Sequence, residues 1–310
     1  MEGKIETIEI KASTPKFSRL AASALFDALT VLLLAFLLSL AVFPIYFATP
    51  AYQESTSLRE EVMVESHLYE KHDGGVRLIS TALKENDALT YEAKSESLSS
   101  SLSYCYSVYL NEEFEGMGLE KLNGYYASLA YDGASLFSSD GSRLLEDERY
   151  DEAYFNAYVE VVESHGASDL SLKKGFSEAR AKILWGYLIS FLIAFSFSCF
   201  ALLLAVPLCL KKGKRTLGMQ LTKLAYLDQW GFSPSWQRWV LHFLFQWILI
   251  LCGAFFSFGA TLVFSCAFSA WRKDHQSISD YVLAVYQVDA SSSEILEKEE
   301  ELLKGEGGTL

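Results

Sequence analysis

Three stretches of this 310-residue chain are almost free of charged side chains, and they limit its possible folds more than any other feature. They cover residues 28–47, 183–210 and 240–271. A helix rises about 1.5 Å per residue, so about 20 apolar residues are needed to cross the roughly 30 Å hydrocarbon core of a bilayer. All three stretches are long enough. The sequence therefore predicts an α-helical transmembrane protein.

The first two stretches are apolar around the whole helical circumference, as residues 32–38 and 192–195 illustrate. A buried helix of a soluble protein normally keeps a polar stripe, so this pattern favours membrane spans. The first run also exceeds the roughly 7 to 15 apolar residues of a signal peptide. We therefore expect residues 20–47 to be a retained anchor.

The third stretch allows two interpretations. Its length exceeds one upright span and barely allows two short helices. Basic residues flank it on both sides, and Gly253 and Gly259 could interrupt it, so a re-entrant hairpin is one prediction. The alternative is a membrane-surface helix over residues 236–247 that leads into one tilted span.

The distribution of positive charge predicts the orientation. Loops rich in Lys and Arg stay on the cytoplasmic side of a membrane. We therefore expect a multi-pass plasma-membrane protein with a cytoplasmic N-terminus and with residues 48–181 outside. The basic residues are Lys4, Lys11, Lys16 and Arg19 before the first stretch, and Lys211, Lys212, Lys214, Arg215 and Lys223 after the second.

The segment over residues 48–181 carries the chain's excess of acid. Its 25 Asp and Glu against 11 Lys and Arg give a net charge of −14, so nucleic acid is excluded as its partner. Helical patterning over residues 58–69 and 150–162 predicts a mainly helical domain, with its tyrosines in the core. We expect turns between helices at the glycine-containing residues 73–75, 132–133 and 138–141.

These patterns divide the chain into seven parts. They are a cytoplasmic arm (1–19), transmembrane helix 1 (20–47), an acidic extracytoplasmic domain (48–181), transmembrane helix 2 (182–210), a cytoplasmic segment (211–238), the third membrane segment (239–271) and a C-terminal tail (272–310).

No motif for catalysis or cofactor binding occurs in the sequence, so we expect neither an enzyme nor a cofactor. Cysteine spacing typical of zinc sites is also absent, and Cys105 alone lies in the acidic domain. Cation binding remains a weaker option there, through the acidic groups Glu112, Glu113 and Glu115, and Glu146, Asp147 and Glu148.

Three separated pieces resemble the RDD family of membrane proteins, which is named for one arginine and two aspartates. They are residues 19–22 with Asp27, residues 216–221 continuing to 227–231, and residues 275–281. The resemblance covers residues 16–47 and 183–288. It implies a charge cluster of Arg19, Asp27 and Asp280, and a cytoplasmic helix, strand and turn marked by Thr216, Leu217, Gly218, Asp228 and Gly231.

The chain departs from the family pattern at several positions. The spacing from Arg19 to Asp27 is one residue longer than usual. Met219 replaces a basic residue, Ser279 replaces a histidine, and Ala284 with Val285 replaces Gly-Thr.

Asp27 is the most informative charged residue, because a carboxylate in a membrane segment is costly unless it is paired, protonated or close to water. Arg19 lies about 12 Å away along a helix and about 80° around it, so a direct pair would be strained. Other basic residues, Lys214, Arg215 or Arg238, are alternative partners. Asp27 could equally lie at the cytoplasmic interface. On the third stretch, His242 and Gln246 share a helical face, which favours packing through polar contacts, with a proton relay or ligand site as the alternative.

The resemblance implies an RDD-like membrane protein with transport as one candidate role. It would then be homo-oligomeric, because three spans rarely enclose a pathway alone. The alternative is a non-transporting sensor, scaffold or accessory protein that binds an extracytoplasmic partner through residues 48–181. The lipid bilayer is a partner in both cases.

The predicted orientation can be tested with a membrane-impermeant thiol reagent. A cysteine at Ser100 should react from outside intact cells, and one at Gly213 should not. The opposite labelling pattern would overturn the orientation.

Overall fold

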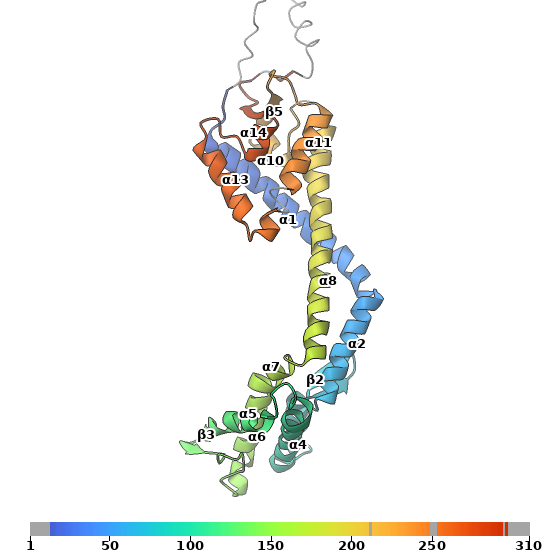
Figure 1. The fold of residues 1–310 in the computed structure, drawn as a ribbon, viewed down its shortest axis with the longest axis vertical. Coiled ribbons are helices and arrows are strands. Elements are labelled where there is room, and N and C mark those ends of the chain that lie inside the picture. The colour runs from blue at the N-terminus through green and yellow to red at the C-terminus, as the bar shows by residue number, and fades with distance from the viewer. Residues whose placement is uncertain (1–12, 211–212, 249–252, 294, 297–310) are drawn as a thin grey trace, which may run out of the picture. The chain divides into compact units, whose positions relative to one another are not determined.

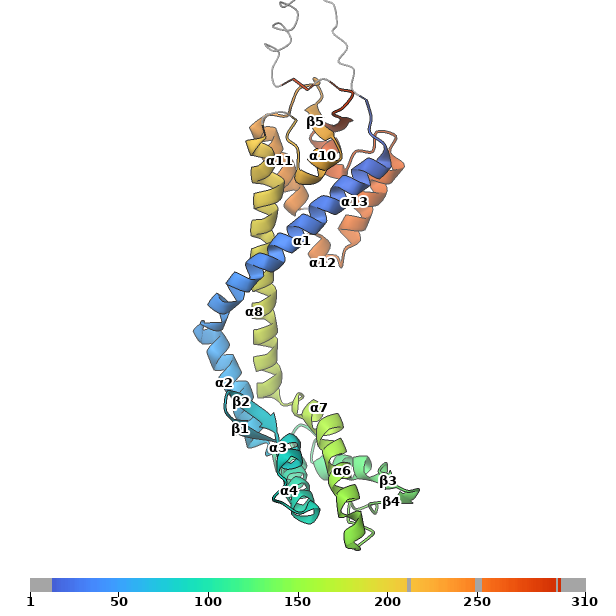
Figure 2. The ribbon, with the colours of Figure 1, turned by 180° about the vertical axis from the view of Figure 1, so that it is seen from behind.

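The computed structural model describes residues 13–210, 213–248, 253–293 and 295–296, and these are mainly helical. The chain forms two compact units. Unit 1 combines the chain up to Phe43 with the chain from Ile189 onward, and unit 2 comprises Pro44–Leu188. Figures 1 and 2 show the elements of both units from opposite sides.

Two helices are long and apolar enough to cross a membrane. One is α1 (Phe17–Phe47). The other runs without a break from Lys174 to Cys209 through α8 (Lys174–Cys199), the π-helix η4 (Phe200–Ala205) and α9 (Val206–Cys209). Only 17% and 22% of their most apolar windows are buried. Such large exposed apolar surfaces are unfavourable in water, so both helices fit the first two predicted spans.

The wide π-helical turn of η4 directly precedes Pro207. Proline has no backbone N–H and cannot continue the regular α-helical bonding, so a local change of helix type is expected there.

Unit 2 is built mainly from short helices. After the end of α1, the chain forms α2 (Pro50–Glu65), β1 (Tyr69–His72), β2 (Gly75–Leu78), α3 (Ile79–Glu85), α4 (Tyr91–Tyr104), the π-helix η1 (Cys105–Tyr109), α5 (Gly118–Ala127), β3 (Ala130–Tyr131), β4 (Ala134–Ser135), the 3-10 helix η2 (Glu148–Tyr150), α6 (Asp151–Val161), the π-helix η3 (Val162–Gly166) and α7 (Ala167–Leu170).

Two of the turns expected between helices instead close β-hairpins. β1 pairs antiparallel with β2 around Asp73-Gly74, and β3 pairs with β4 around Asp132-Gly133. Asp-Gly favours two-residue hairpin turns because both residues tolerate positive φ, and Asp132 (49°) and Gly133 (78°) both show it. The prediction of turns between helices was therefore wrong at these two sites.

One continuous apolar core holds unit 2 together. It includes Leu98, Leu102 and Leu122 and, as expected, several of the tyrosines. Tyr106, Tyr126, Tyr154 and Tyr158 are each at most 4% exposed. Their hydroxyl groups need partners when buried, and Tyr154 donates to the carbonyl of Leu136 at 2.9 Å.

A buried aspartate joins several helices of this unit. Asp169 is 7% exposed and accepts hydrogen bonds from the hydroxyls of Tyr106 (2.7 Å) and Tyr125 (2.8 Å) and from Lys121 Nζ (2.8 Å). Burial and this carboxylate raise the pKa of Tyr106, so its phenol stays protonated and donates. The three donors offset the cost of burying the carboxylate.

The chain enters and leaves unit 2 through one aromatic cluster. Tyr46 and Phe47, at the end of α1, each lie 5.7 Å from the ring of Tyr187 on α8. A side chain at Gly186 would overlap with the Tyr46 ring, so glycine permits this close approach.

Unit 1 adds a two-stranded sheet and short helices to the two long ones. These elements are α10 (Leu217–Leu221), β5 (Leu224–Asp228), α11 (Trp236–Phe245), α12 (Gly253–Phe256), α13 (Ala260–Trp271), α14 (Ile278–Val282) and β6 (Val285–Asp289). β5 pairs antiparallel with β6, with Leu224 opposite Asp289 and Asp228 opposite Val285. The core under this sheet includes Leu20, Met219, Tyr226, Trp239 and Val285.

The third apolar stretch turns back on itself. α12 and α13 are joined by a tight turn in which Phe258 (φ 50°) and Gly259 (φ 86°) are left-handed. The Ser257 hydroxyl accepts from the Thr261 N–H at 3.2 Å and so starts α13. α13 has 12 residues, too few to span a bilayer alone. The described part of this stretch therefore contains a turn between two helices, and α13 is a third, shorter apolar helix.

Because the apolar core of unit 2 lies between Val62 and Leu170, residues 51–180 should fold alone. We expect the isolated fragment to melt cooperatively. Leu98→Ala should destabilise it by about 2–5 kcal/mol, since Leu98 is fully buried. Val108→Ala, at a 59% exposed position, is the matched control with little effect. A non-cooperative melt of the unaltered fragment, measured by circular dichroism, would refute independent folding.

Candidate functional site

The short helix α10 is held at its N-terminus by Asp27 of α1. The carboxylate accepts a hydrogen bond from the Thr216 hydroxyl (2.5 Å) and another from the Gly218 backbone N–H (2.7 Å). The first N–H groups of a helix lack partners within the helix, and negative charge is favoured there. Thr216 also caps α10 itself, since its hydroxyl accepts from the Met219 N–H.

Gly218 allows the two helices to approach closely. A side-chain carbon there would overlap with the Ser23 carbonyl oxygen of α1 and press on the Asp27 carboxyl group. The glycine of the family motif is therefore required by packing, because any side chain would push α10 away from Asp27.

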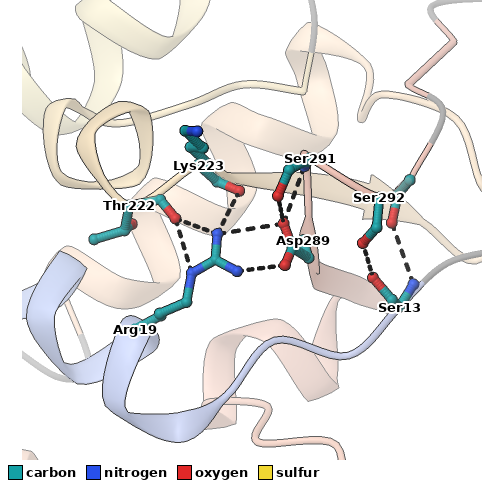
Figure 3. A network of polar contacts seen from close by, with 8 residues as sticks. Ser13, Arg19, Thr222, Lys223, Asp289, Ser291 and Ser292 are labelled. Carbon is teal, nitrogen blue, oxygen red and sulfur yellow. Dashed lines mark hydrogen bonds and ion pairs between the residues drawn. The ribbon is translucent and has the colours of Figure 1, made fainter.

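The opposite end of α10 is held by Arg19 of the same helix α1. Its guanidinium donates to the carbonyl oxygens of Thr222 and Lys223, at 2.5–3.1 Å and 3.2 Å. It also forms a two-point ion pair with the Asp289 carboxylate at the end of β6 (Figure 3). Burial of this pair is partial, with side-chain exposures of 31% and 18%.

Asp289 is kept ionised by its surroundings. Hydrogen bonds from Arg19 and from Ser291, both shown in Figure 3, hold the pKa of this carboxyl well below its usual range. The backbone N–H of Asp289 also donates to the Ser13 carbonyl at 3.1 Å. The carboxylate therefore ties β6 to the start of α1.

Arg19 and Asp27 consequently act on the two ends of one helix instead of on each other. The Asp27 carboxylate contacts the N-terminal N–H groups of α10, and the Arg19 guanidinium contacts its C-terminal carbonyls. Both charges therefore interact favourably with the helix dipole. The span from Thr216 to Thr222 is about 9 Å along the α10 axis, close to the roughly 12 Å from Arg19 to Asp27. We call this arrangement the α10 clamp.

The second family aspartate, Asp280, is completely buried and pairs with a histidine. Its Oδ1 lies 2.7 Å from Nε2 of His242 on α11, and the two side chains are 0% and 1% exposed. Its Oδ2 accepts from the Ser277 N–H (3.1 Å) and from Gln287 Nε2 (2.9 Å). The Ser277 contact completes a capping box at the start of α14.

Hydrogen bonds outweigh burial at Asp280. Burial raises the pKa of this carboxyl, but bonds from His242, Ser277 and Gln287 lower it further, so the pKa lies below its ordinary value. Gln287 Nε2 also contacts the Tyr226 hydroxyl at 3.1 Å. Burial and the nearby charges of Asp280 and then Asp27 raise the pKa of Tyr226. The carboxylates of Asp280 and Asp27 therefore both disfavour ionisation of the Tyr226 hydroxyl.

Within the described residues, two buried nitrogens of this network have no hydrogen-bond partner: Nδ1 of His242 and Nε1 of Trp239. The two rings stack at 5.1 Å, and Tyr226 packs against both.

The predicted cytoplasmic helix, strand and turn are present as α10, β5 and the residues that follow. Leu217 is the first residue of α10. Asp228 ends β5, and its carboxylate accepts from the backbone N–H groups of Trp230 (2.9 Å) and Phe232 (3.0 Å). Gly231 has φ of 82°, which explains the glycine of this turn.

One departure from the family pattern has a conformational cost. Ala284 occupies the position where glycine is typical, and its φ is 48°. Left-handed backbone favours glycine, so the alanine is strained at this junction between α14 and β6.

The sequence did not reveal the actual partners of the three family residues. Asp27 contacts Thr216 and Gly218. Arg238, one of the basic partners considered for it, pairs with Asp228 at 3.4 Å. Asp289 and Gln287 were missed altogether. Their one signal is the alternating pattern of a strand, which placed no side chain beside α1 or α14.

Acidic groups do not assemble a metal site in the part of the chain that the structure describes. No group of three or more His, Cys, Asp or Glu side chains there could hold a metal ion. Glu113 instead pairs with Lys173 at 3.2 Å.

The fold and these contacts define a mainly helical protein with two helices of bilayer-spanning length. Residues 157–284 match the model of the RDD family. The match includes α10, Asp228 and Asp280 but not α1, and it begins earlier than the expected residue 183. No curated protein and no solved structure matched the chain.

The α10 clamp predicts a specific pattern of energetic coupling. Asp27→Asn should lower the free energy of unfolding by about 1–3 kcal/mol, because it weakens two hydrogen bonds to a charged group. In double-mutant cycles, Asp27 should couple with Thr216, and Arg19 with Asp289. Arg19 and Asp27 should not couple. Unfolding in mixed micelles measures all three cycles. Rescue of function or stability by exchanging Arg19 and Asp27 would contradict the clamp.

Proposed function

We propose that this RDD-family protein is a membrane-anchored, non-transporting scaffold or sensor that binds a partner through unit 2. The observation that supports this proposal most strongly is the apolar core of unit 2, which contains no residue of unit 1. A folded domain with its own core can bind a partner while the remaining chain serves as its membrane anchor.

The aromatic cluster around Tyr46, Phe47 and Tyr187 supports the same proposal. Tyrosine is enriched where helices pass from hydrocarbon to water. Because both chain connections of unit 2 meet at this cluster, we place unit 2 on one side of the bilayer. Together with the basic residues near the N-terminus, the cluster supports our proposal that unit 2 lies outside and the α10 clamp in the cytoplasm.

The contacts of Arg19, Asp27 and Asp228 also favour an anchoring role. Arg19 and Asp27 are fully occupied with the ends of α10, and Asp228 with its own turn. A side chain that binds and releases a transported ion must exchange its partners. Arg19, Asp27 and Asp228 are instead held by hydrogen bonds to backbone groups, so this exchange is not favoured. We propose no enzymatic activity.

Transport is the second candidate, and one observation favours it. The buried pair His242–Asp280 continues through Gln287 to Tyr226. Buried ionisable groups in a membrane protein are frequently parts of proton or ion pathways. In this second proposal the protein would act as a homo-oligomer, and His242 would carry the exchanged proton.

Reconstitution separates the two proposals. Purified full-length protein in vesicles should conduct neither protons nor sodium above the rate of empty vesicles, when measured with pH-sensitive and sodium-sensitive dyes under an imposed gradient. Flux that is lost in both His242→Gln and Asp280→Asn, with unchanged vesicle incorporation, would overturn the scaffold proposal in favour of transport.

The binding role has its own measurement. A photo-crosslinking residue at Val108 or Met117, both more than half exposed in unit 2, should give discrete crosslinked products in cells. The matched control is the same group at the exposed residue Gln229 in unit 1. Equal products from all three positions would show that unit 2 has no special binding role.

A further inference from the structure

The α12–α13 hairpin has an apolar surface that unit 1 leaves uncovered. Phe256 and Phe258 at the turn are 82% and 102% exposed. On α13, Leu262, Val263 and Phe264 are 45%, 68% and 65% exposed. Residues 253–271 include no Asp, Glu, Lys, Arg or His, whereas Arg272 and Lys273 follow immediately. An apolar surface of this size is unfavourable in water and needs a covering partner.

The end of α13 lies beside the start of α1. The ring of His275, just after α13, is 5.3 Å from the ring of Phe17, the first residue of α1. The Ser269 hydroxyl donates to the His275 carbonyl, which fixes this connection. α13 therefore extends from the same end of unit 1 from which α1 begins.

The lengths of the two helices then determine how deep the hairpin reaches. α1 has 31 residues and is about 46 Å long, whereas the 12 residues of α13 extend about 18 Å. Figures 1 and 2 show the turn between α12 and α13 level with the middle of α1. A hydrocarbon core of roughly 30 Å cannot be crossed by 18 Å of helix.

The turn itself is suited to an apolar environment. Backbone N–H groups must find partners within the protein when no water is present. The Ser257 N–H donates to the Gly253 carbonyl (2.9 Å), the Ala260 N–H to the Ser257 carbonyl (3.1 Å) and the Thr261 N–H to the Ser257 hydroxyl (3.2 Å). Three N–H groups at this turn are thus bonded locally.

Aromatic residues mark the two ends of the segment. Trp236, the first residue of α11, is 63% exposed, and Trp271, the last residue of α13, is 92% exposed. Tryptophan prefers the boundary between headgroups and hydrocarbon. Both ends therefore fit the same face of a bilayer.

We propose that the α12–α13 hairpin is a re-entrant membrane element that inserts into one leaflet from the side of the α10 clamp, with Phe258 near the bilayer centre. Its partner is the acyl-chain region of that leaflet. Arg272 and Lys273 remain among the headgroups, which limits the depth of insertion.

Depth measurement by spin labelling tests this proposal. Single nitroxide-labelled cysteines at Phe258, Val263 and Trp271 are suitable, because these exposed side chains make little contribution to packing. Every labelled variant has the native cysteines at 105, 199, 209, 252 and 266 replaced, and the full chain is reconstituted in phosphatidylcholine–phosphatidylglycerol vesicles. The ratio of collision rates with oxygen and with a water-soluble nickel complex reports depth. Ser100 in unit 2 provides a water-exposed control.

The expected result is a ratio that rises steadily from position 271 through 263 to 258, by several-fold overall. Two results would overturn the proposal. A maximum at 263 with a low value at 258 would show that the hairpin crosses the whole bilayer. Low ratios at all three positions, similar to position 100, would show that it lies outside the membrane. Neither result depends on whether unit 2 binds a partner.

Discussion

The charge pairing around α10 is the interaction on which unit 1 depends. A five-residue helix is too short to be stable alone, because the entropy lost in forming the first turn exceeds the stabilisation from its few hydrogen bonds. Asp27 and Arg19 compensate by satisfying the free N–H and carbonyl groups at its two ends. With α10 fixed on α1, β5 follows directly, and its pairing with β6 brings Asp289 back to Arg19. The clamp and the Arg19–Asp289 pair thus connect the beginning of the described chain with a strand near its end.

The same contacts position the buried hydrogen-bond network around Asp280. β6 carries Gln287 between Asp289 and the α14 helix, so the strand that contacts Arg19 also contacts Asp280. Asp280 in turn joins α14 to α11 through His242. Burying a polar pair of this kind contributes little net stability when compared with apolar packing, yet removing one partner is costly because it leaves the other unpaired. The pair therefore fixes one point of contact between α11 and α14.

The two units differ in how they meet the cost of burying charge. Unit 2 buries one aspartate, Asp169, and surrounds it with two phenols and a lysine. Unit 1 buries Asp280 with an imidazole, an amide and a backbone N–H. In unit 2 the network lies at the edge of the apolar core, where Tyr106 is buried and Tyr125 and Lys121 are partly exposed. In unit 1 the corresponding network lies beside helices whose apolar surfaces remain exposed, so hydrocarbon is the natural solvent for that part of the molecule.

The sequence by itself determined which segments are long and apolar enough to span a bilayer, because hydrophobicity along a helix is a local property. The resemblance to the RDD family, carried by residues 216–221 and 227–231, also implied the helix α10, the strand β5 and the Asp228–Gly231 turn. The hairpin turns at Asp73-Gly74 and Asp132-Gly133 were equally local and could have been predicted. Only the tertiary structure decided that Arg19 pairs with Asp289, 270 residues away, and that His242 is the partner of Asp280. Such pairs depend on how strands and helices are brought together in space, and a single sequence contains no local signal for that arrangement.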